Sequence, residues 1–316
     1  MKKILLMIIL CMTLLSSCNK QQNDTGVTKV TNYLSSLSSY SLSSTMTINR
    51  PDKKISMNVC VDYLSPSYYK VIFGANQEQI IIKNDEGVFV LTPSLNKEFK
   101  FDSQWPLNGS HAYLLEAINK DLKADSEIIE SSENGIITLE CKIQHKTNKK
   151  ATKMKYICGN DFKPIKTVFM NDSNEEIIIV DFDSFQPNTN LGKDHFNEKK
   201  YLNKEILNKD EETSFTIEAG YVLEGSSLIS SSYDDETAVL CYSGDVNYTI
   251  VMNKAIVYSE IVVIENYDDF EVLECGLCLF KENSMRYYLK GYEISIYSLD
   301  LEYEDYLNIA ESITLV

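Results

Sequence analysis

The sequence predicts an α+β protein in which a large, curved antiparallel sheet with two covering helices is followed by a smaller α+β domain. Long runs alternate between apolar and polar residues, and Asn, Asp, Gly and Pro turn signals separate them. Two segments of the first half show helical spacing instead, and a polar, charge-rich stretch divides the chain. A single sheet of about ten strands must curl, so its apolar face has to be covered by helices or filled by a ligand.

The N-terminus reads as a lipoprotein signal. Lys2 and Lys3 precede an apolar run, 4–15, that is too short to span a bilayer comfortably. The sequence LSSC at 15–18 matches the bacterial lipobox, in which Cys18 is diacylated and becomes the first mature residue. An ordinary secretion signal with an incidental cysteine is the alternative. We expect a signal peptide at 1–17 and a tether at 18–26, with the acyl anchor holding the protein on the outer face of the cytoplasmic membrane.

Residues 27–185 form the first predicted domain. Apolar spacing predicts one helix between Val27 and Leu37 and another between Tyr113 and Leu122. Alternating runs between and after the helices predict about ten strands, with hairpin turns at 49–52 and at the Asn-Gly pair 134–135. The run 86–106 predicts two strands that fold around Pro93 and are closed by the only tryptophan of the chain.

The second half contains a predicted linker and a second domain. Residues 186–212 are polar and charge-rich, so we expect a linker with one helical turn. Residues 213–316 combine several alternating strands with a C-terminal helix. The apolar face of that helix is formed by Tyr303, Tyr306, Leu307, Ala310 and Ile313.

The charge of the chain argues against nucleic acid as a partner. Its formal net charge is -16, which repels phosphate backbones and anionic lipid headgroups alike. Membrane attachment therefore has to come from the acyl anchor. Arg50 and Arg286 are the only arginines.

The motifs of common catalytic and metal sites are missing from the sequence. The three histidines are far apart and outside any HExxH pattern, and no GxSxG, phosphate-binding glycine loop or dinucleotide fingerprint occurs. Acidic runs such as 234–236 and 268–269 indicate solvated turns rather than a calcium site. We therefore predict that the protein is not an enzyme and has no catalytic residues, metal or cofactor. A buried carboxylate pair in a polar cleft would favour an enzyme instead.

Six cysteines follow Cys18. An even number of cysteines in an oxidising exterior is compatible with disulfides, but their positions within apolar, strand-like runs favour buried free thiols. They are Cys60, Cys141, Cys158, Cys241, Cys275 and Cys278. The last two have the spacing of a redox CxxC motif, yet on a strand this spacing sends them to opposite faces.

The stretch 63–115, with EGVFVLTPSLNKEFKF and the following WP, resembles Gram-positive lipoproteins related to the outer-membrane lipoprotein carriers of the LolA and LolB type. The similarity covers 27–185, and 213–316 resembles a small domain of unknown function found downstream in the same lipoproteins. The resemblance implies a helix-flanked, unclosed β-barrel with an apolar groove. It also implies lipid or partner binding, a link to sporulation or germination, and no catalytic residues. The carriers are soluble shuttles, whereas this chain has its own anchor signal, and Arg50 is the candidate for their groove arginine.

Alternation and the resemblance together place nine apolar side chains on the concave face of the sheet. They are Leu42, Met46, Ile48, Met57, Val59, Val71, Phe73, Phe99 and Phe101. Exposing such a face to water is unfavourable by about 25 cal/mol per Å². If the helices cover the face fully, it is a core; if they sit apart, acyl chains enter. The leading hypothesis is an anchored protein that binds a lipid or lipopeptide or docks an envelope partner. The alternative is a regulatory sensor that acts on a membrane signalling protein of the anti-sigma type.

Overall fold

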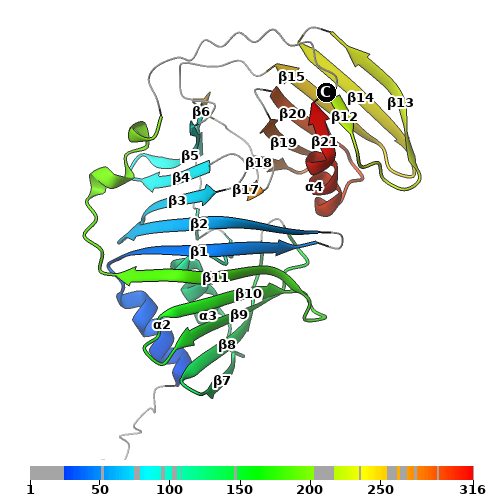
Figure 1. The fold of residues 1–316 in the computed structure, drawn as a ribbon. Helices are drawn as coiled ribbons and strands as arrows, with labels where there is room; N and C mark the ends of the chain where they lie inside the picture. Colours follow the sequence, from blue (N-terminus) through cyan, green and yellow to red (C-terminus); the bar gives the residue numbers. More distant parts are fainter. Residues whose placement is uncertain are drawn as a thin grey trace, which may run out of the picture.

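The structure is a computed structural model, shown as a ribbon in Figure 1. It describes residues 25–50, 53–74, 79–93, 97–101, 105–107, 109–145, 148–202, 217–234, 236–254, 262–263, 269–273, 276–289 and 292–315. Cys18, the predicted signal peptide and most of the predicted tether lie outside these residues. Among the helices of the described part, none is long and apolar enough to cross a membrane.

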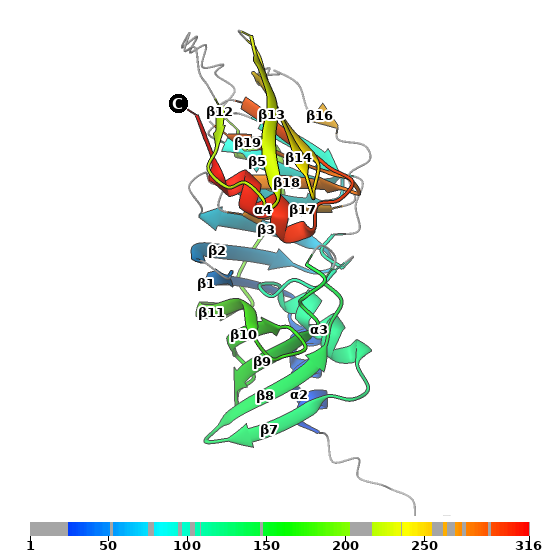
Figure 2. The ribbon, with the colours of Figure 1, turned by 90° about the vertical axis from the view of Figure 1, so that its right-hand side faces the viewer.

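A twelve-stranded sheet forms the first unit, in the order β16-β6-β5-β4-β3-β2-β1-β11-β10-β9-β8-β7. Its strands are β1 (Ser39–Asn49), β2 (Lys54–Leu64), β3 (Tyr68–Gly74), β4 (Gln79–Asn84), β5 (Gly87–Thr92), β6 (Lys97–Phe101), β7 (Ile129–Glu133), β8 (Ile136–Lys142), β9 (Lys153–Gly159), β10 (Pro164–Met170), β11 (Glu176–Pro187) and β16 (Val262–Val263). All neighbours are antiparallel except β16 and β6. The order has two free ends, β16 and β7, so these strands form an open, curved sheet, as predicted (Figures 1 and 2).

The alternating sequence explains which side of each strand is buried. Along β2, Ile55, Met57, Val59 and Val61 are buried, while the residues between them are exposed or half-buried. The predicted Asn-Gly turn joins β7 to β8, and both Asn134 (φ 51°) and Gly135 (φ 79°) adopt the left-handed conformation that such a turn requires. Period-two burial therefore fixes the register of the sheet.

Two helices cover part of one face of this sheet, α2 (Gly26–Ser36) and α3 (Leu115–Ala124). Thr25 caps α2 by accepting a hydrogen bond from the Thr28 N–H, and the Glu130 carboxylate of β7 accepts the N–H of Gly26 at 3.0 Å. Figure 2 shows both helices on the same side of the lower strands. The first half is thus the predicted curved sheet with two covering helices.

The predicted linker is in part a packed segment. β11 continues to Pro187, and two short 3₁₀ helices follow, η2 (Lys193–Phe196) and η3 (Glu198–Lys200). Phe196 is fully buried against Tyr68, Phe89 and other side chains on the outer face of β3, β4 and β5. This segment makes β4 buried on both faces. The remaining residues of the predicted linker, 203–212, lie outside the described residues.

A polar cluster holds the same segment to the sheet. His195 Nε2 lies 2.7 Å from Asp62 Oδ2 and 2.6 Å from Lys70 Nζ. Lys70 forms an ion pair with Asp62 at 2.8 Å, and Ser41 donates to the other carboxylate oxygen at 2.6 Å. His195 thus holds the segment after β11 against the convex face of the sheet.

The second unit is a seven-stranded antiparallel sheet in the order β13-β14-β15-β20-β19-β18-β17, with a two-stranded pair, β12-β21, beside it. Its elements are β12 (Ile217–Ala219), β13 (Ser226–Tyr233), β14 (Thr237–Gly244), β15 (Tyr248–Lys254), β17 (Asp269–Leu273), β18 (Gly276–Lys281), β19 (Ser284–Leu289), β20 (Tyr292–Tyr297), α4 (Tyr303–Ser312) and β21 (Ile313–Leu315). Helix α4 begins with a capping box of Glu302 and Asp305 and packs on the sheet through Tyr306, Leu307, Ile309 and Ala310. The predicted fold class, a curved sheet followed by a smaller α+β unit, is confirmed.

The two units share one apolar core. Phe270 of β17 and Leu277 and Leu279 of β18 are buried in the cluster that fills the concave face of the large sheet. The ring of Phe270 lies 4.9 Å from that of Phe101, and Tyr288 stacks on Phe99 at 5.3 Å. The small unit is therefore a second cover for the concave face, beside the two helices. The predicted domain limits stay a prediction.

Cys60, Cys141, Cys158 and Cys241 are free thiols. Cys141, Cys158 and Cys278 are buried, and burial raises the pKa of Cys141 and of Cys158 to about 12. Cys60 is exposed and Cys241 is only half-buried, so the expectation that both are buried was wrong. It alternates with Val59 and Val61 on β2 and therefore faces outward. Cys275 lies outside the described residues.

Glu116, the second residue of α3, directs its carboxylate toward the aromatic core. Glu116 accepts a hydrogen bond of 2.7 Å from the hydroxyl of Tyr40, which is fully buried. Burial raises the pKa of Glu116 to about 7, although the bond from Tyr40 opposes the shift. Because its pKa in the unfolded chain is near 4.5, the acid makes folding less favourable as the pH rises from about 4.5 to above 7.

Replacing this acid should stabilise the protein at high pH. Glu116→Gln keeps an acceptor for Tyr40 but removes the buried charge, so we expect the free energy of unfolding to increase by about 2 kcal/mol at pH 8 and not at pH 4.5. Urea unfolding at both pH values measures the difference. Glu133→Gln on exposed β7 is the control and should change neither value. An equal gain at both pH values would contradict the assignment.

Candidate functional site

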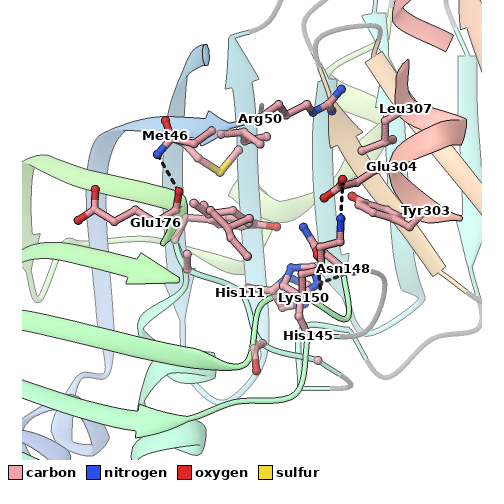
Figure 3. Close-up of a pocket in the computed structure, with 18 of the residues that line it drawn as sticks. Met46, Arg50, His111, His145, Asn148, Lys150, Glu176, Tyr303, Glu304 and Leu307 are labelled. Carbon is pink, nitrogen blue, oxygen red and sulfur yellow. Dashed lines mark hydrogen bonds and ion pairs between the residues drawn. The ribbon is translucent and has the colours of Figure 1, made fainter. Parts of the chain in front are cut away.

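A cavity of about 440 Å³ opens where the concave face of the large sheet meets the small unit. Its wall is built by the end of β1, by Phe73 of β3 and Ile81 of β4, by the loop 109–113, by His145, Asn148 and Lys150, by the β10–β11 turn with the start of β11, and by helix α4 and Phe270 of β17. Its volume lies within the range of small-molecule sites. Figure 3 shows the lining side chains converging on this space from both units.

The floor of the cavity is apolar because alternate residues of neighbouring strands point to it. Met46 and Ile48 of β1 face the same side, and Ile48 pairs with Ile178 of β11. Phe73 of β3 contacts Tyr113 edge-on, with ring centroids 5.2 Å apart. The other apolar lining residues are Ile81, Ala112, Ile177, Phe270 and Leu307. This surface suits hydrocarbon and not a charged group.

The rim is polar and comes from loops and from α4. Lys150 forms an ion pair with Glu304 of α4 at 2.6 Å (Figure 3), and both side chains remain partly exposed. His145 Nδ1 accepts the backbone N–H of Asn148 at 3.1 Å. Further polar lining residues are Ser110, His111, Asn171, Glu175, Glu176 and Tyr303. The cavity thus offers an apolar interior beneath a hydrogen-bonding entrance.

A buried ion pair fixes α4 at the edge of the cavity. Arg50 Nη1 lies 2.6 Å from Glu311 Oε2, and the two side chains are only 7% and 5% exposed. Lys53, on the other side of the β1–β2 turn, also pairs with Glu311. The hairpin of β1 and β2 therefore holds the small unit through charge as well as through the shared core (Figure 1).

Polar atoms of cavity-lining residues are also buried in this wall. Asn49 Oδ1 and Arg50 Nη2 are examples, and neither makes a hydrogen bond to the described part of the chain. Asn49 uses its amide N–H to bond the Glu176 carbonyl at 2.9 Å, which orients the side chain. A buried polar group without a partner is unfavourable by about 1–3 kcal/mol. Both atoms are enclosed by protein at the edge of the cavity, so this wall is polar but closed to solvent.

The nine predicted groove residues all belong to the core of the concave face, but only three reach the cavity. Met46, Ile48 and Phe73 line it. Phe99 and Phe101 are buried because Tyr288 and Phe270 of the small unit cover them. Leu42, Met57, Val59 and Val71 are buried in the same core without lining the cavity. Their role in ligand binding stays a prediction.

Sequence reasoning singled out one residue of the rim, Arg50, and missed the others. His111, Asn148 and Lys150 lie in irregular loops, where no periodicity indicates a direction. Histidines far apart in the sequence come together here, since His111 and His145 line one cavity. No group of three or more His, Cys, Asp or Glu side chains among the described residues is arranged to hold a metal ion.

Comparison with known proteins assigns the chain to a family. A family model described as sporulation protein YdcC-like matches residues 1–196. The chain belongs to the sporulation protein YdcC-like family. It is 27% identical over 319 aligned residues to the sporulation protein YdcC of Bacillus subtilis (strain 168), covering 96% of this chain and 94% of that protein. The family model ends at the last residue of η2, so it covers every strand of the large sheet except β16 and leaves the cavity wall formed by α4 outside.

Two solved structures are similar to the chain at low identity. The complex of Pseudomonas aeruginosa MucA/MucB is 11% identical, covers 90% of this chain and 98% of that chain, and has a TM-score of 0.34. A LolA superfamily protein from Nitrosomonas europaea is 12% identical, covers 56% of this chain and 99% of that chain, and has a TM-score of 0.31. Neither likeness bears on function at TM-scores this low.

Removing the acid of the buried ion pair should destabilise the protein strongly. Glu311→Gln leaves the guanidinium of Arg50 enclosed without a counter-charge, so we expect a loss of about 3 kcal/mol in the free energy of unfolding. Thermal and urea unfolding measure it. Glu304→Gln on the same helix removes only the partly exposed pair with Lys150 and should cost about 0–1 kcal/mol. Similar losses in the two variants would show that the Arg50 pair does not hold α4.

Proposed function

We propose that the protein is an extracytoplasmic binding protein, lipid-anchored through Cys18, whose cavity takes the apolar part of an amphiphilic ligand. The observation that carries this proposal is the cavity itself, with its apolar floor of Met46, Ile48 and Phe73 and its polar rim. A lipid or lipopeptide places hydrocarbon on such a floor and its polar group at the entrance. An apolar segment of an envelope protein has the same two-part chemistry.

The polar wall supports an amphiphile over a plain hydrocarbon. Lys150 and Glu304 remain partly exposed at the rim and offer a donor and an acceptor beside the apolar floor. A ligand with hydroxyl or amide groups forms hydrogen bonds there while its hydrocarbon lies on the floor. The rim also carries carboxylates, Glu175 and Glu176, so a strongly anionic headgroup is repelled from that side.

The setting we propose is the outer face of the cytoplasmic membrane during sporulation or germination. Membership of the sporulation protein YdcC-like family supports the biological context. The lipobox at 15–18 supports the location, because two acyl chains hold a protein at a membrane without any spanning helix. We propose a binding role without catalysis, which is in keeping with a lining that combines an apolar floor with a rim of paired side chains.

A sensor that acts on a membrane signalling protein is the second candidate, and the position of α4 favours it. Tyr303, Glu304 and Leu307 of this helix belong to the cavity wall, together with Phe270 of β17 in the same unit. A ligand in the cavity therefore touches both units and biases how they sit together. A membrane signalling protein that binds only one arrangement of the two units would then respond to a ligand in the cavity.

Occupancy of the cavity can be measured on the protein extracted from cells in mild detergent. Native mass spectrometry should show a retained lipid or lipopeptide, or an envelope protein should co-purify. Ile178→Trp fills the cavity floor and should lower the retained species about tenfold, which corresponds to a loss of about 1.4 kcal/mol of binding free energy. The control is Ile165→Trp, at an exposed position of β10. Absence of any retained species in the unmodified protein would count against both binding hypotheses.

Anchoring through Cys18 is tested by fractionation. Cys18→Ala removes the acylated thiol, so we expect the protein to move almost entirely from the membrane fraction to the soluble one. Cys60→Ala, which removes an exposed thiol of the folded part, should leave it in the membrane fraction. Immunoblotting of the two fractions measures the distribution, and membrane retention of the Cys18 variant would exclude a purely acyl anchor.

A further inference from the structure

Strand β13 forms one end of the small sheet. It pairs with β14 on one side, and no strand of the described part lies on its other side. Figure 1 places it at the outer edge of the small unit, away from α2 and α3, and Figure 2 shows it projecting from the same end of the molecule. The backbone N–H and C=O groups along such an edge are able to pair with an added strand.

The residues around this edge are unusually apolar for an exposed surface. Of the eleven exposed large hydrophobic residues in the described part of the chain, five lie between 221 and 233: Tyr221, Val222, Leu228, Ile229 and Tyr233. The strand itself, SSLISSSY, has eight residues and contains no charge and no proline. Soluble proteins usually protect sheet edges with those residues. The only protecting feature here is a register shift between Leu228 and Ser230.

Exposed carboxylates lie at both ends of β13. Glu224 and Asp245 are exposed at its beginning, and Asp245 donates its backbone N–H to the carbonyl of Gly225. Asp234 and Glu236 are exposed at its end, where Asp234 Oδ1 accepts the N–H of Glu236 at 2.9 Å. Lys254 is the neighbouring cation at that end, bonded through its backbone to Glu236. The four described acids outnumber it, so the edge carries Leu228, Ile229 and Tyr233 among serines, between two negative ends.

We propose that β13 docks an extended segment of a partner protein, apolar in its centre and carrying Lys or Arg at its ends, which adds to the sheet as an eighth strand. Main-chain hydrogen bonds supply the pairing, and Leu228 and Tyr233 contact the apolar centre. The charges select the partner. Antiparallel pairing of two copies of β13 brings Asp234 and Glu236 of one copy beside Glu224 of the other, which is repulsive at both ends. The site is separate from the cavity and does not depend on the function proposed for it.

Two synthetic peptides test the proposal against the full-length protein in detergent. Both have an alternating Thr-Val core; one carries two lysines at each end, and the other carries two glutamates. Fluorescence anisotropy should show that the basic peptide binds at least about tenfold more tightly at low salt, with the difference disappearing at about 1 M salt. Equal affinity for the two peptides at low salt would overturn the charge selection.

Variants assign the binding to this edge. Ser231→Lys puts a cation on the strand position opposite Leu240, and Glu236→Lys reverses a charge at its end; each should weaken the basic peptide about tenfold or more. Glu282→Lys makes the same charge change in the exposed β18–β19 turn of the same unit and should have no effect. Unchanged binding in Ser231→Lys would overturn the proposal. A second result would also overturn the proposal: if the unmodified protein forms a dimer and Ser231→Lys abolishes it, the edge binds a second copy of this chain.

Discussion

The docking of the small unit onto the concave face is the interaction on which the cavity depends. The concave face of the large sheet is apolar and has two covers: α2 and α3 over the strands near β7 and β8, and β17 to β19 of the small unit over β5 and β6. Phe270 packs against both Phe101 and Trp105, which places a side chain of the second unit inside the core of the first. The cavity is the space between these covers. Without the small unit, the aromatic half of the concave face would be exposed to water.

Charge determines how the two units are oriented at this contact. The chain is strongly acidic, and α4 begins with Glu302, Glu304 and Asp305. The cations of the first unit that meet this helix are Arg50, Lys53 and Lys150, which pair with Glu311 and Glu304. The Arg50 pair is deeply buried, so its attraction is largely offset by the cost of removing both charges from water. The pair fixes where α4 lies but adds little to the free energy of folding. The apolar contact supplies most of the free energy that holds the two units together.

The sequence predicts the strands and helices in which apolar residues recur at a regular spacing. It does not predict contacts between residues far apart in the chain. Alternation identifies the strands of both sheets and the Asn134 turn, and it placed Met46 and Ile48 on the correct face. It also explains why Cys60 points outward, although apolar neighbours had suggested burial. Alternation shows which face is apolar but not what covers it, so the covering of Phe99 by Tyr288 could not be foreseen. The rim of the site is built from irregular loops, and the packed segment around Phe196 looked like a plain polar linker, because a single buried aromatic residue has no period.

The binding and sensing hypotheses follow from the same geometry. A ligand that contacts Phe73 on one side and Leu307 on the other favours the docked arrangement by the free energy of those contacts, and an arrangement that widens the cavity loses them. Helix α4 packs on the small sheet, with Tyr287 donating a hydrogen bond to the Ala310 carbonyl at 2.8 Å. Strand β13 belongs to the same sheet. A displacement of α4 that carries this sheet with it would reach the outer edge, where a second protein has access to it.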